Sequence, residues 1–465
     1  MHFPQFTQTF RAAAFFSLLF TPLAAQANLL EKLMAANISA TNATVCFTSI
    51  DTEGNKVPTT AVLQWSEDSS FSNQTTEQFS DKTNPDDPIS GLRAMYMEGL
   101  KPDTFYNWKI IAKTADGQTE ESGGSFTTLP VSTTKKRGPD GTHIPPHTPA
   151  YETPATYTAS SWEEVNNLLD GCSGGEVIEV DAEDSSDQES IVLRSGNSDW
   201  EKNVLIRPPL GKRASNRTRS VEINSPHITV AGFNLRAAHM FSKMGNGARG
   251  GNAVGEGARR SFFWMCTVSR NGSMMADGCP DSGWFEVVAL HRGVGRDRSQ
   301  IKTQAELIPE NFTVAGCWLE GKDRTNKDDH CDTIQTFSHG HGQKITGLKL
   351  IDSVFFRSAN SAGQLNNLKG TLIENCWFGP LDQRSPVNGS YYATVGASNE
   401  AIIRGSDWNG TFRQDIEPDA IPAEIRDSSF PKMPKRPGPI FENNNVSGEL
   451  VPQPPLPDLD AIWPK

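Results

Sequence analysis

The hexapeptide VAGFNL, at Val230–Leu235, decides the fold, because five later hexapeptides repeat its pattern. Each has an aliphatic residue first, a small or turn-tolerant residue third and a large apolar residue last. The later units are VAGCWL (Val314–Leu319), IDSVFF (Ile351–Phe356), IENCWF (Ile373–Phe378), IRGSDW (Ile403–Trp408) and IRDSSF (Ile425–Phe430). Repeats of roughly twenty to forty residues are typical of solenoids and other repeat arrays.

The repeat units favour β-structure over helix. No helical period runs through them, and each contains one or two short strands followed by a polar loop of variable length. The long gap between the first two units holds two more strand-like segments, FFWMCTV and WFEVVAL. Stacked coils would bury the first and last positions of each unit as ladders, as in a parallel β-helix.

Residues 156–435 resemble the right-handed parallel β-helix superfamily of pectate lyases and related polysaccharide enzymes. The segment SSWEEVNNLLDGCSGGEVIEVDAED resembles the helical N-terminal cap of such domains, and KNVLIRPP and VEINSPHITVAGFNL resemble their first coils. The resemblance implies an all-β fold with a right-handed, single-stranded parallel β-helix. It does not choose an activity, because the superfamily includes lyases, hydrolases, epimerases and proteins without catalysis.

Residues 28–130 have a different construction. Short alternating strands such as ATVCFTSI and TAVLQWSE predict an antiparallel β-sandwich. The residues Leu100, Pro102, Thr104, Tyr106 and Trp108, with a closing FTTLP, resemble a fibronectin type III domain. The following residues 131–155 are rich in Pro, Thr and Gly and predict an extended linker with solvated histidines. A Pro-rich tail is expected at 436–465, either along the solenoid or free.

The N-terminus and the charge constrain location and partners. Residues 1–27 have a basic residue, a short apolar run and an A-x-A end, which predicts a signal peptide and secretion to the periplasm or the exterior. No later apolar run is long enough to span a bilayer. The net charge of −12 disfavours nucleic acid as a partner. The expected partner is an extracellular polysaccharide, bound by a monomer.

The stretch KDDHCDTIQTFSHGHG, residues 327–342, concentrates titratable side chains between two repeat units. It holds three of the nine histidines, His330, His339 and His341. Strand alternation predicts that Ile334 points inward and Gln335 outward, with Asp332 on the bend before the strand. We expect this segment at a groove along the β-helix.

Three chemistries fit that segment. The first is β-elimination on a uronic-acid polysaccharide, which needs a base, an acid and neutralisation of the substrate carboxylate. The second is hydrolysis, since KDDHCDTI and HGHG resemble elements of polygalacturonase-type hydrolases. The third is a metal site of nitrogen and oxygen ligands for Zn²⁺ or a similar ion. A polar loop without chemistry is the fourth alternative.

The preferred hypothesis is a polysaccharide lyase, with a β-helix hydrolase or a non-catalytic glycan-binding or adhesive protein as alternatives. The predicted catalytic residues are His330, Asp332, His339, His341 and Arg357. The predicted substrate-binding residues are Lys327, Gln335, His291 and Arg384. The resemblance implies Ca²⁺ or another divalent cation as the candidate cofactor, with Asp328 and Asp329 as its expected ligands.

Overall fold

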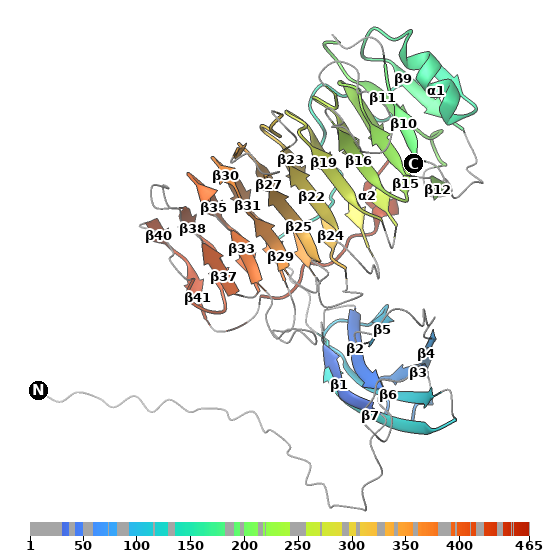
Figure 1. The fold of residues 1–465 in the computed structure, drawn as a ribbon, viewed down its shortest axis with the longest axis vertical. Coiled ribbons are helices and arrows are strands. Elements are labelled where there is room, and N and C mark those ends of the chain that lie inside the picture. Colours follow the sequence, from blue (N-terminus) through green and yellow to red (C-terminus); the bar gives the residue numbers. More distant parts are fainter. Residues whose placement is uncertain are drawn as a thin grey trace, which may run out of the picture.

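The structure, a computed structural model, contains an N-terminal antiparallel β-domain and a long parallel β-helix (Figure 1). It describes residues 30–36, 42–49, 59–72, 74–80, 93–114, 117–128, 135–181, 190–195, 200–212, 217–218, 220–241, 257–269, 272–290, 297–303, 307–322, 331–338, 343–356, 361–379, 392–395, 398–409, 411–414, 423–434, 440–447, 449 and 451–464.

Seven strands form the N-terminal domain as two antiparallel sheets, ordered β1-β2-β5 and β4-β3-β6-β7. Side chains of both sheets share one hydrophobic core, so the domain is a β-sandwich, as the alternation predicted. The strands are β1 (Leu30–Ala36), β2 (Asn42–Ser49), β3 (Thr59–Ser66), β4 (Thr75–Ser80), β5 (Arg93–Glu98), β6 (Phe105–Thr114) and β7 (Thr119–Thr127).

Tyr106 fixes the corner at the start of β6. Its ring is buried, and its Oη accepts a hydrogen bond of 3.0 Å from the backbone N–H of Lys101. Such a tyrosine corner is typical of immunoglobulin-like sandwiches. Trp108 and Ile110 follow it into the core by strand alternation. Membership of the domain in the fibronectin type III group stays a prediction.

The β-helix consists of three long parallel sheets and one short one. The twelve-stranded sheet contains β8 (Tyr157–Ala159), β9 (Val177–Val180), β11 (Val204–Arg207), β14 (Ile228–Ala231), β17 (Phe262–Trp264), β20 (Gly283–Phe285), β23 (Thr313–Ala315), β27 (Lys349–Ile351), β31 (Leu372–Glu374), β35 (Ile402–Arg404), β38 (Glu424–Arg426) and β40 (Ile440–Glu442). The ten-stranded sheet contains β12 (Arg217–Thr218), β15 (Asn234–Leu235), β18 (Thr267–Val268), β21 (Val288–Ala289), β24 (Trp318–Glu320), β28 (Val354–Phe356), β32 (Trp377–Phe378), β36 (Asp407–Trp408), β39 (Ser429–Phe430) and β41 (Asn445–Val446).

The nine-stranded sheet forms the third side of the coils (Figure 1). It contains β10 (Ile191–Leu193), β13 (Val221–Ile223), β16 (Ala238–Phe241), β19 (Met274–Asp277), β22 (Ser299–Lys302), β25 (Asp332–Phe337), β29 (Ser361–Leu365), β33 (Tyr392–Val395) and β37 (Thr411–Gln414). A short sheet of β26 (Ile345–Thr346), β30 (Leu368–Lys369) and β34 (Ser398–Asn399) adds to the later coils. This topology confirms the predicted all-β fold with a parallel β-helix.

The hexapeptides carry the chain from the twelve-stranded to the ten-stranded sheet. The third residue of each has a positive φ, for example 77° at Gly232 and 60° at Gly316, so the chain turns sharply there. FWMCTV (263–268) and WFEVVA (284–289) belong to the same series, with φ of 47° at Met265 and 54° at Glu286.

The expected unit at Ile351–Phe356 is wrong by one residue. Leu350 pairs with Val314 and Ile373, the first residues of the neighbouring units, so the unit runs from Leu350 to Phe355. Asp352 then takes the third position, with a φ of 49°. The prediction was shifted by one residue because Ile351 and Phe356 also fit the apolar pattern. Only the register that starts at Leu350 points the first and last side chains of the unit inward.

The last position of the later units builds an aromatic ladder inside the β-helix. The rings of Phe355 and Phe378 stack with centroids 4.9 Å apart, and those of Phe378 and Trp408 with centroids 4.1 Å apart. All three side chains are fully buried. Such stacked contacts stabilise the core beyond the burial of apolar area.

Two short helices lie at the ends of the β-helix chain, α1 (Trp162–Leu169) and α2 (Leu459–Ile462). The Ser161 side chain caps α1 by accepting from the Glu164 N–H at 3.2 Å. The apolar face of α1, Val165 and Leu169, packs into the core of the first coils, as expected for an N-terminal cap. Among the described residues, no helix is long and apolar enough to cross a membrane.

The segment between the two domains is docked, in contrast to the expected solvated linker. Arg137 is buried, and its Nη1 lies 2.5 Å from Asp407 Oδ2. A Cβ at Gly316 would collide with the His143 ring, and one at Gly232 with Tyr151 Oη. The described part of the linker therefore runs along the turns between the twelve- and ten-stranded sheets, where glycines make room for it.

The C-terminal tail covers the same side of the β-helix. Trp463 is buried in an apolar layer outside the coils, together with Tyr151 of the linker and Trp318 and Trp377 of the ten-stranded sheet. The backbone O of Val451 accepts from Trp377 Nε1 at 3.2 Å. The tail runs back along the solenoid to the first coils (Figure 1), the first of the two arrangements expected.

The aromatic ladder predicts a large loss of stability when its middle ring is removed. Phe378→Ala should lower the free energy of unfolding by about 3–5 kcal/mol, because the stacked neighbours cannot close the cavity. Ile402→Ala, at a side chain 42% exposed, is the matched control and should change stability by less than about 1 kcal/mol. Chemical denaturation followed by tryptophan fluorescence measures both; equal losses would contradict the ladder.

Candidate functional site

The outer face of the nine-stranded sheet presents two columns of side chains. Parallel pairing places residues of successive coils above one another, and alternation points every second one outward. The first column reads Glu222, His239, Met275, Gln300, Gln335 and Gln364. The second column reads Phe241, Asp277, Lys302 and Phe337.

The second column places an ion pair between two aromatic rings. Lys302 Nζ lies 3.3 Å from Asp277 Oδ2 and 5.7 Å from the centroid of the Phe337 ring. On the other side, the Phe241 ring packs edge-on against the His239 imidazole, with centroids 5.7 Å apart. Apolar rings beside fixed charges are suited to bind a sugar ring and its ionised group together.

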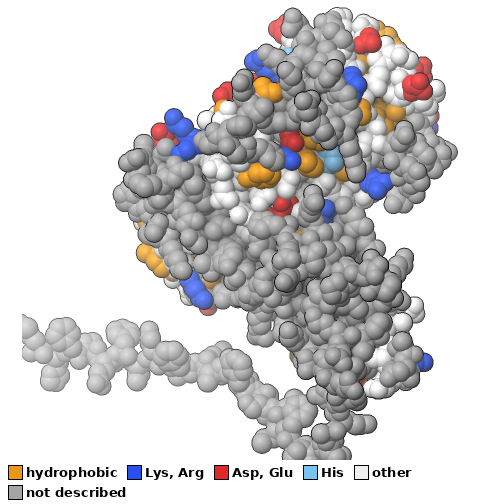
Figure 2. All heavy atoms as spheres, viewed as in Figure 1, with side chains coloured by type: hydrophobic (Ala, Val, Ile, Leu, Met, Phe, Trp, Pro, Cys, Tyr) orange, Lys and Arg blue, Asp and Glu red, His pale blue; other side chains and the backbone are white. Residues whose placement is uncertain are grey.

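A second lysine completes the group. Lys322, which follows β24, is buried, and its charge and that of Lys302 both act on His239. We call His239, Asp277, Lys302 and Lys322 the charged cluster. In Figure 2, acidic, basic, histidine and apolar side chains lie together in a hollow over β16, β19 and β22.

Burial and neighbouring charges move the pKa values of the cluster toward or away from neutrality. Burial raises the pKa of Asp277 to about 6, against the opposing effect of Lys302. Burial, with the positive charge of Arg298, lowers the pKa of Lys322 to about 8. Burial and the two lysine charges lower the pKa of His239 to about 4, so its imidazole is neutral at pH 7.

These pKa values allow Asp277 to act as a base and Lys322 to act as an acid at the same pH. Between about pH 6 and 8, Asp277 is ionised and can take a proton, while Lys322 is protonated and can give one. Lys302 forms the ion pair with Asp277. A pair of titrating groups with pKa values on either side of pH 7 is a common feature of acid–base sites.

Two of the residues predicted from the histidine segment are described. Gln335 points outward and Ile334 inward, which confirms the expected alternation. Asp332 is fully buried, on the same side of β25 as Ile334, and its backbone N–H donates to Asp297 Oδ1 at 2.6 Å. Asp332 therefore lies in the strand and not on the preceding bend expected for it, because β25 begins one residue earlier than expected.

The remaining predicted site residues lie outside the described residues. They are His291, Lys327, Asp328, Asp329, His330, His339, His341, Arg357 and Arg384. Their catalytic, substrate-binding and metal-binding roles stay predictions.

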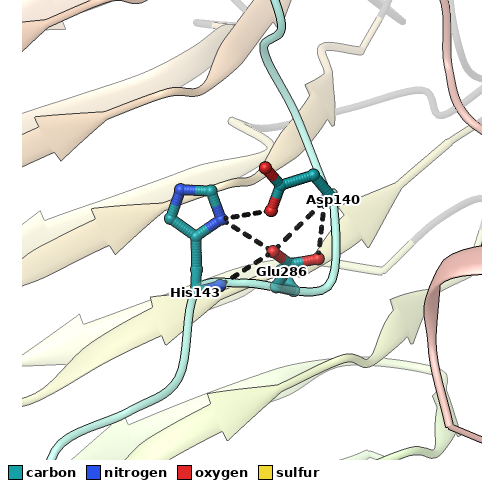
Figure 3. Close-up of side chains that lie close together, drawn as sticks. All are labelled: Asp140, His143 and Glu286. Carbon is teal, nitrogen blue, oxygen red and sulfur yellow. Dashed lines mark hydrogen bonds and ion pairs between the residues drawn. The ribbon is translucent and has the colours of Figure 1, made fainter.

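A second titratable group lies at the turn between β20 and β21, under the linker (Figure 3). His143 Nδ1 is 2.7 Å from Glu286 Oε1 and 3.2 Å from Asp140 Oδ1, while its Nε2 is 3.0 Å from Asp352 Oδ2. Asp140, His143 and Glu286 are the described residues that could together ligate a metal ion. We call Asp140, His143, Glu286, Asp352 and Trp463 the Glu286 junction.

The hydrogen bonds of Glu286 favour a structural role for this junction. Its side chain is fully buried, and its Oε2 accepts from the N–H groups of Asp140 and Gly141, both at 3.0 Å, and from Trp463 Nε1 at 2.9 Å. Its Oε1 accepts from His143. Donors of the linker and the tail thus already satisfy this carboxylate, as a buried charge requires.

The His143 imidazole is held as a cation. Burial opposes its charge, but the carboxylates of Asp352 and Glu286 outweigh burial and raise the pKa of His143 to about 10. His143 therefore joins the linker to two coils by ion pairs on both ring nitrogens.

Comparisons with known proteins give only remote similarity. No protein-family model matches the sequence, and no curated protein matches it. The sensor domain of the anti-sigma factor RsgI4 of Pseudobacteroides cellulosolvens is similar at 22% identity over 23% of this chain and 100% of that domain, with a TM-score of 0.17.

Two β-helix proteins are similar over longer stretches. The family 28 exopolygalacturonase of Yersinia enterocolitica shares 10% identity over 91% of this chain and 88% of its own, with a TM-score of 0.26. The tailspike gp49 of Acinetobacter baumannii bacteriophage Fri1, a capsular polysaccharide depolymerase, shares 11% identity over 69% of this chain and 60% of its own, with a TM-score of 0.30. The fold assignment of this chain therefore rests on its own sheet topology.

The Glu286 junction predicts a stability that falls in alkaline solution. A histidine with a folded pKa of about 10 and an ordinary value near 6.5 stabilises the fold fully below about pH 6.5 and loses that contribution progressively up to pH 10. His143→Ala should lower the melting temperature at pH 6 and flatten its decline between pH 7 and 10.

The exposed His147→Ala is the matched control for this measurement, and it should keep the decline of the parent protein. A melting temperature for His143→Ala equal to that of the parent at pH 6, measured by calorimetry, would contradict the ion pairs.

Proposed function

We propose that this protein is a secreted enzyme that cleaves an acidic polysaccharide by β-elimination on the outer face of the nine-stranded sheet. The observation that carries the proposal is the Asp277–Lys302 pair between Phe241 and Phe337. The charge of Lys322 acts on His239 of the same face. The half-buried Phe337 ring offers an apolar face for sugar, and the lysines offer the positive charge that a uronate needs.

In the proposed reaction, Lys302 neutralises the uronate carboxylate, which makes the proton on C5 easier to remove. Asp277 takes that proton. The C5–H electron pair forms the C4–C5 double bond, the C4–O bond breaks, and Lys322 donates a proton to the leaving oxygen. The products are an unsaturated uronate and a new sugar end, so atoms and charge balance.

His239 supports this scheme as a neutral neighbour. Its Nε2 lies 3.0 Å from Ser273 Oγ, which fixes the ring orientation, and its low pKa keeps a third positive charge out of the cluster at neutral pH. A cationic imidazole there would favour the ionised form of Asp277 and make it a weaker base. It would also compete with Lys302 for the substrate carboxylate.

The first test of this proposal is activity on pectate, alginate, glucuronan and glycosaminoglycans, followed by the absorbance of the unsaturated product. Asp277→Asn, Lys302→Met and Lys322→Met should each lower turnover roughly a hundredfold or more, measured at a temperature where circular dichroism shows that each variant is folded. Lys212→Met, which removes an exposed lysine paired with Asp181, is the matched control. New reducing ends without the absorbance would replace elimination by hydrolysis; full activity of all three variants would refute the site.

The pH profile supplies a second prediction. Turnover should be bell-shaped, rising as Asp277 ionises near pH 6 and falling as Lys322 loses its proton near pH 8. The residual turnover of Asp277→Asn should no longer rise near pH 6. A profile that rises without limit through pH 9 would contradict the assignment of Lys322 as the acid.

Metal removal separates this proposal from a reaction that uses Ca²⁺. Because Lys302 neutralises the carboxylate in the proposed scheme, dialysis against EDTA should leave turnover within about twofold of the untreated enzyme. A loss that added Ca²⁺ restores would instead favour the metal-assisted reaction implied by the resemblance.

A further inference from the structure

Next to the charged cluster, the outer face of the nine-stranded sheet carries neutral amide side chains. Gln300 of β22, Gln335 of β25 and Gln364 of β29 occupy one register on three successive coils, and all three are half-buried. We call them the amide track. Gln300 alternates with Lys302 on the same strand, so the track begins beside the Asp277–Lys302 pair.

Hydrogen bonds order the amide track in one direction. Gln300 Nε2 donates to Asp297 Oδ2 at 2.7 Å and to Gln335 Oε1 at 3.4 Å, and Gln335 Nε2 donates to Gln364 Oε1 at 3.5 Å. Asp297 therefore fixes the orientation of the first amide, and each amide fixes the next. A pre-oriented row of amides is a specific hydrogen-bonding surface rather than a set of free side chains.

The dimensions of the track match a bound saccharide. Neighbouring coils are about 4.8 Å apart, so the three amides span roughly 10 Å, the length of about two sugars. Neutral amides with both donors and acceptors suit the hydroxyl groups of uncharged sugars. They offer no positive charge, whereas every sugar of a polyuronate carries a carboxylate that loses solvation on binding.

We infer that the amide track is a binding site for uncharged sugars next to the reacting uronate, and that the substrate is a heteropolysaccharide whose uronates are separated by neutral sugars. This inference rests on the proposed function, because it takes the charged cluster as the place where one uronate binds. The track then selects by charge spacing: a uronate at Lys302, followed by about two sugars without a carboxylate.

The test varies charge while it keeps linkage constant. Glucuronan and pectate are each compared with a partly carboxyl-reduced form, in which about half of the carboxylates are converted to primary alcohols. Affinity electrophoresis and turnover are measured on all four polymers. The parent protein should bind and cleave the reduced form of at least one pair roughly tenfold better than the fully charged form.

Gln335→Lys provides the decisive variant, because it places a cation in the track. It should shift the preference back toward the fully charged polymer roughly tenfold. Gln118→Lys makes the same charge change at an exposed position of the sandwich and should leave the preference unchanged. Gln364→Lys is the second variant if the first alters the melting temperature.

The outcomes separate the two proposals. Cleavage that favours fully charged polymers, with Gln335→Lys and Gln364→Lys without effect, overturns the inference while the proposed function stands, and leaves the amides as a ladder that only stabilises stacked coils. No binding or cleavage of any of the four polymers overturns the inference, and inactivity on alginate and glycosaminoglycans as well overturns the proposed function.

Discussion

One backbone conformation organises the β-helix: the positive φ at the third residue of each hexapeptide. It ranges from 47° at Met265 to 77° at Gly232, and it turns the chain within a single residue between the twelve- and ten-stranded sheets. Because this turn has a constant length, the residues before and after it stay in register from coil to coil. The inner ladders, including the stacked rings of Phe378 and Trp408, follow from that constancy.

The connection to the nine-stranded sheet, the third side of each coil, has no constant length. Loops of variable length lead from the ten-stranded to the nine-stranded sheet, so the spacing from a hexapeptide to an outward residue differs between coils. Parallel pairing restores the register locally, which is why Asp277 and Lys302 meet although 25 residues separate them in sequence. The regular side thus provides the scaffold, and the irregular side is where charged groups gather.

This division explains what the sequence could predict. The hexapeptides stand out in the sequence because their first and last positions point inward and are apolar, and even the register error at Leu350 came from an extra apolar residue. Asp277, Lys302 and Lys322 carried no such signal, since a charged residue after a short strand looks like any solvated one. The density of histidines in 327–342 predicts a site there instead, and of the site residues predicted in that segment only Asp332 and Gln335 are described. The linker composition predicts a solvated His143, because its partners, Glu286 and Asp352, belong to turns far along the chain.

The groups that hydrogen-bond to Glu286 in the Glu286 junction come from segments far apart in the chain. The buried carboxylate of Glu286 receives donors from the linker, made about 145 residues earlier, and from Trp463, made 177 residues later. During synthesis, the coils around Glu286 can form before Trp463 is made, while one hydrogen bond of the carboxylate is still missing. Trp463 Nε1 reaches that carboxylate only when the tail docks, so the tail completes the hydrogen bonds of the junction. The tail therefore ties the turn at Glu286 to the linker through one shared carboxylate, a contact that links three distant parts of the chain.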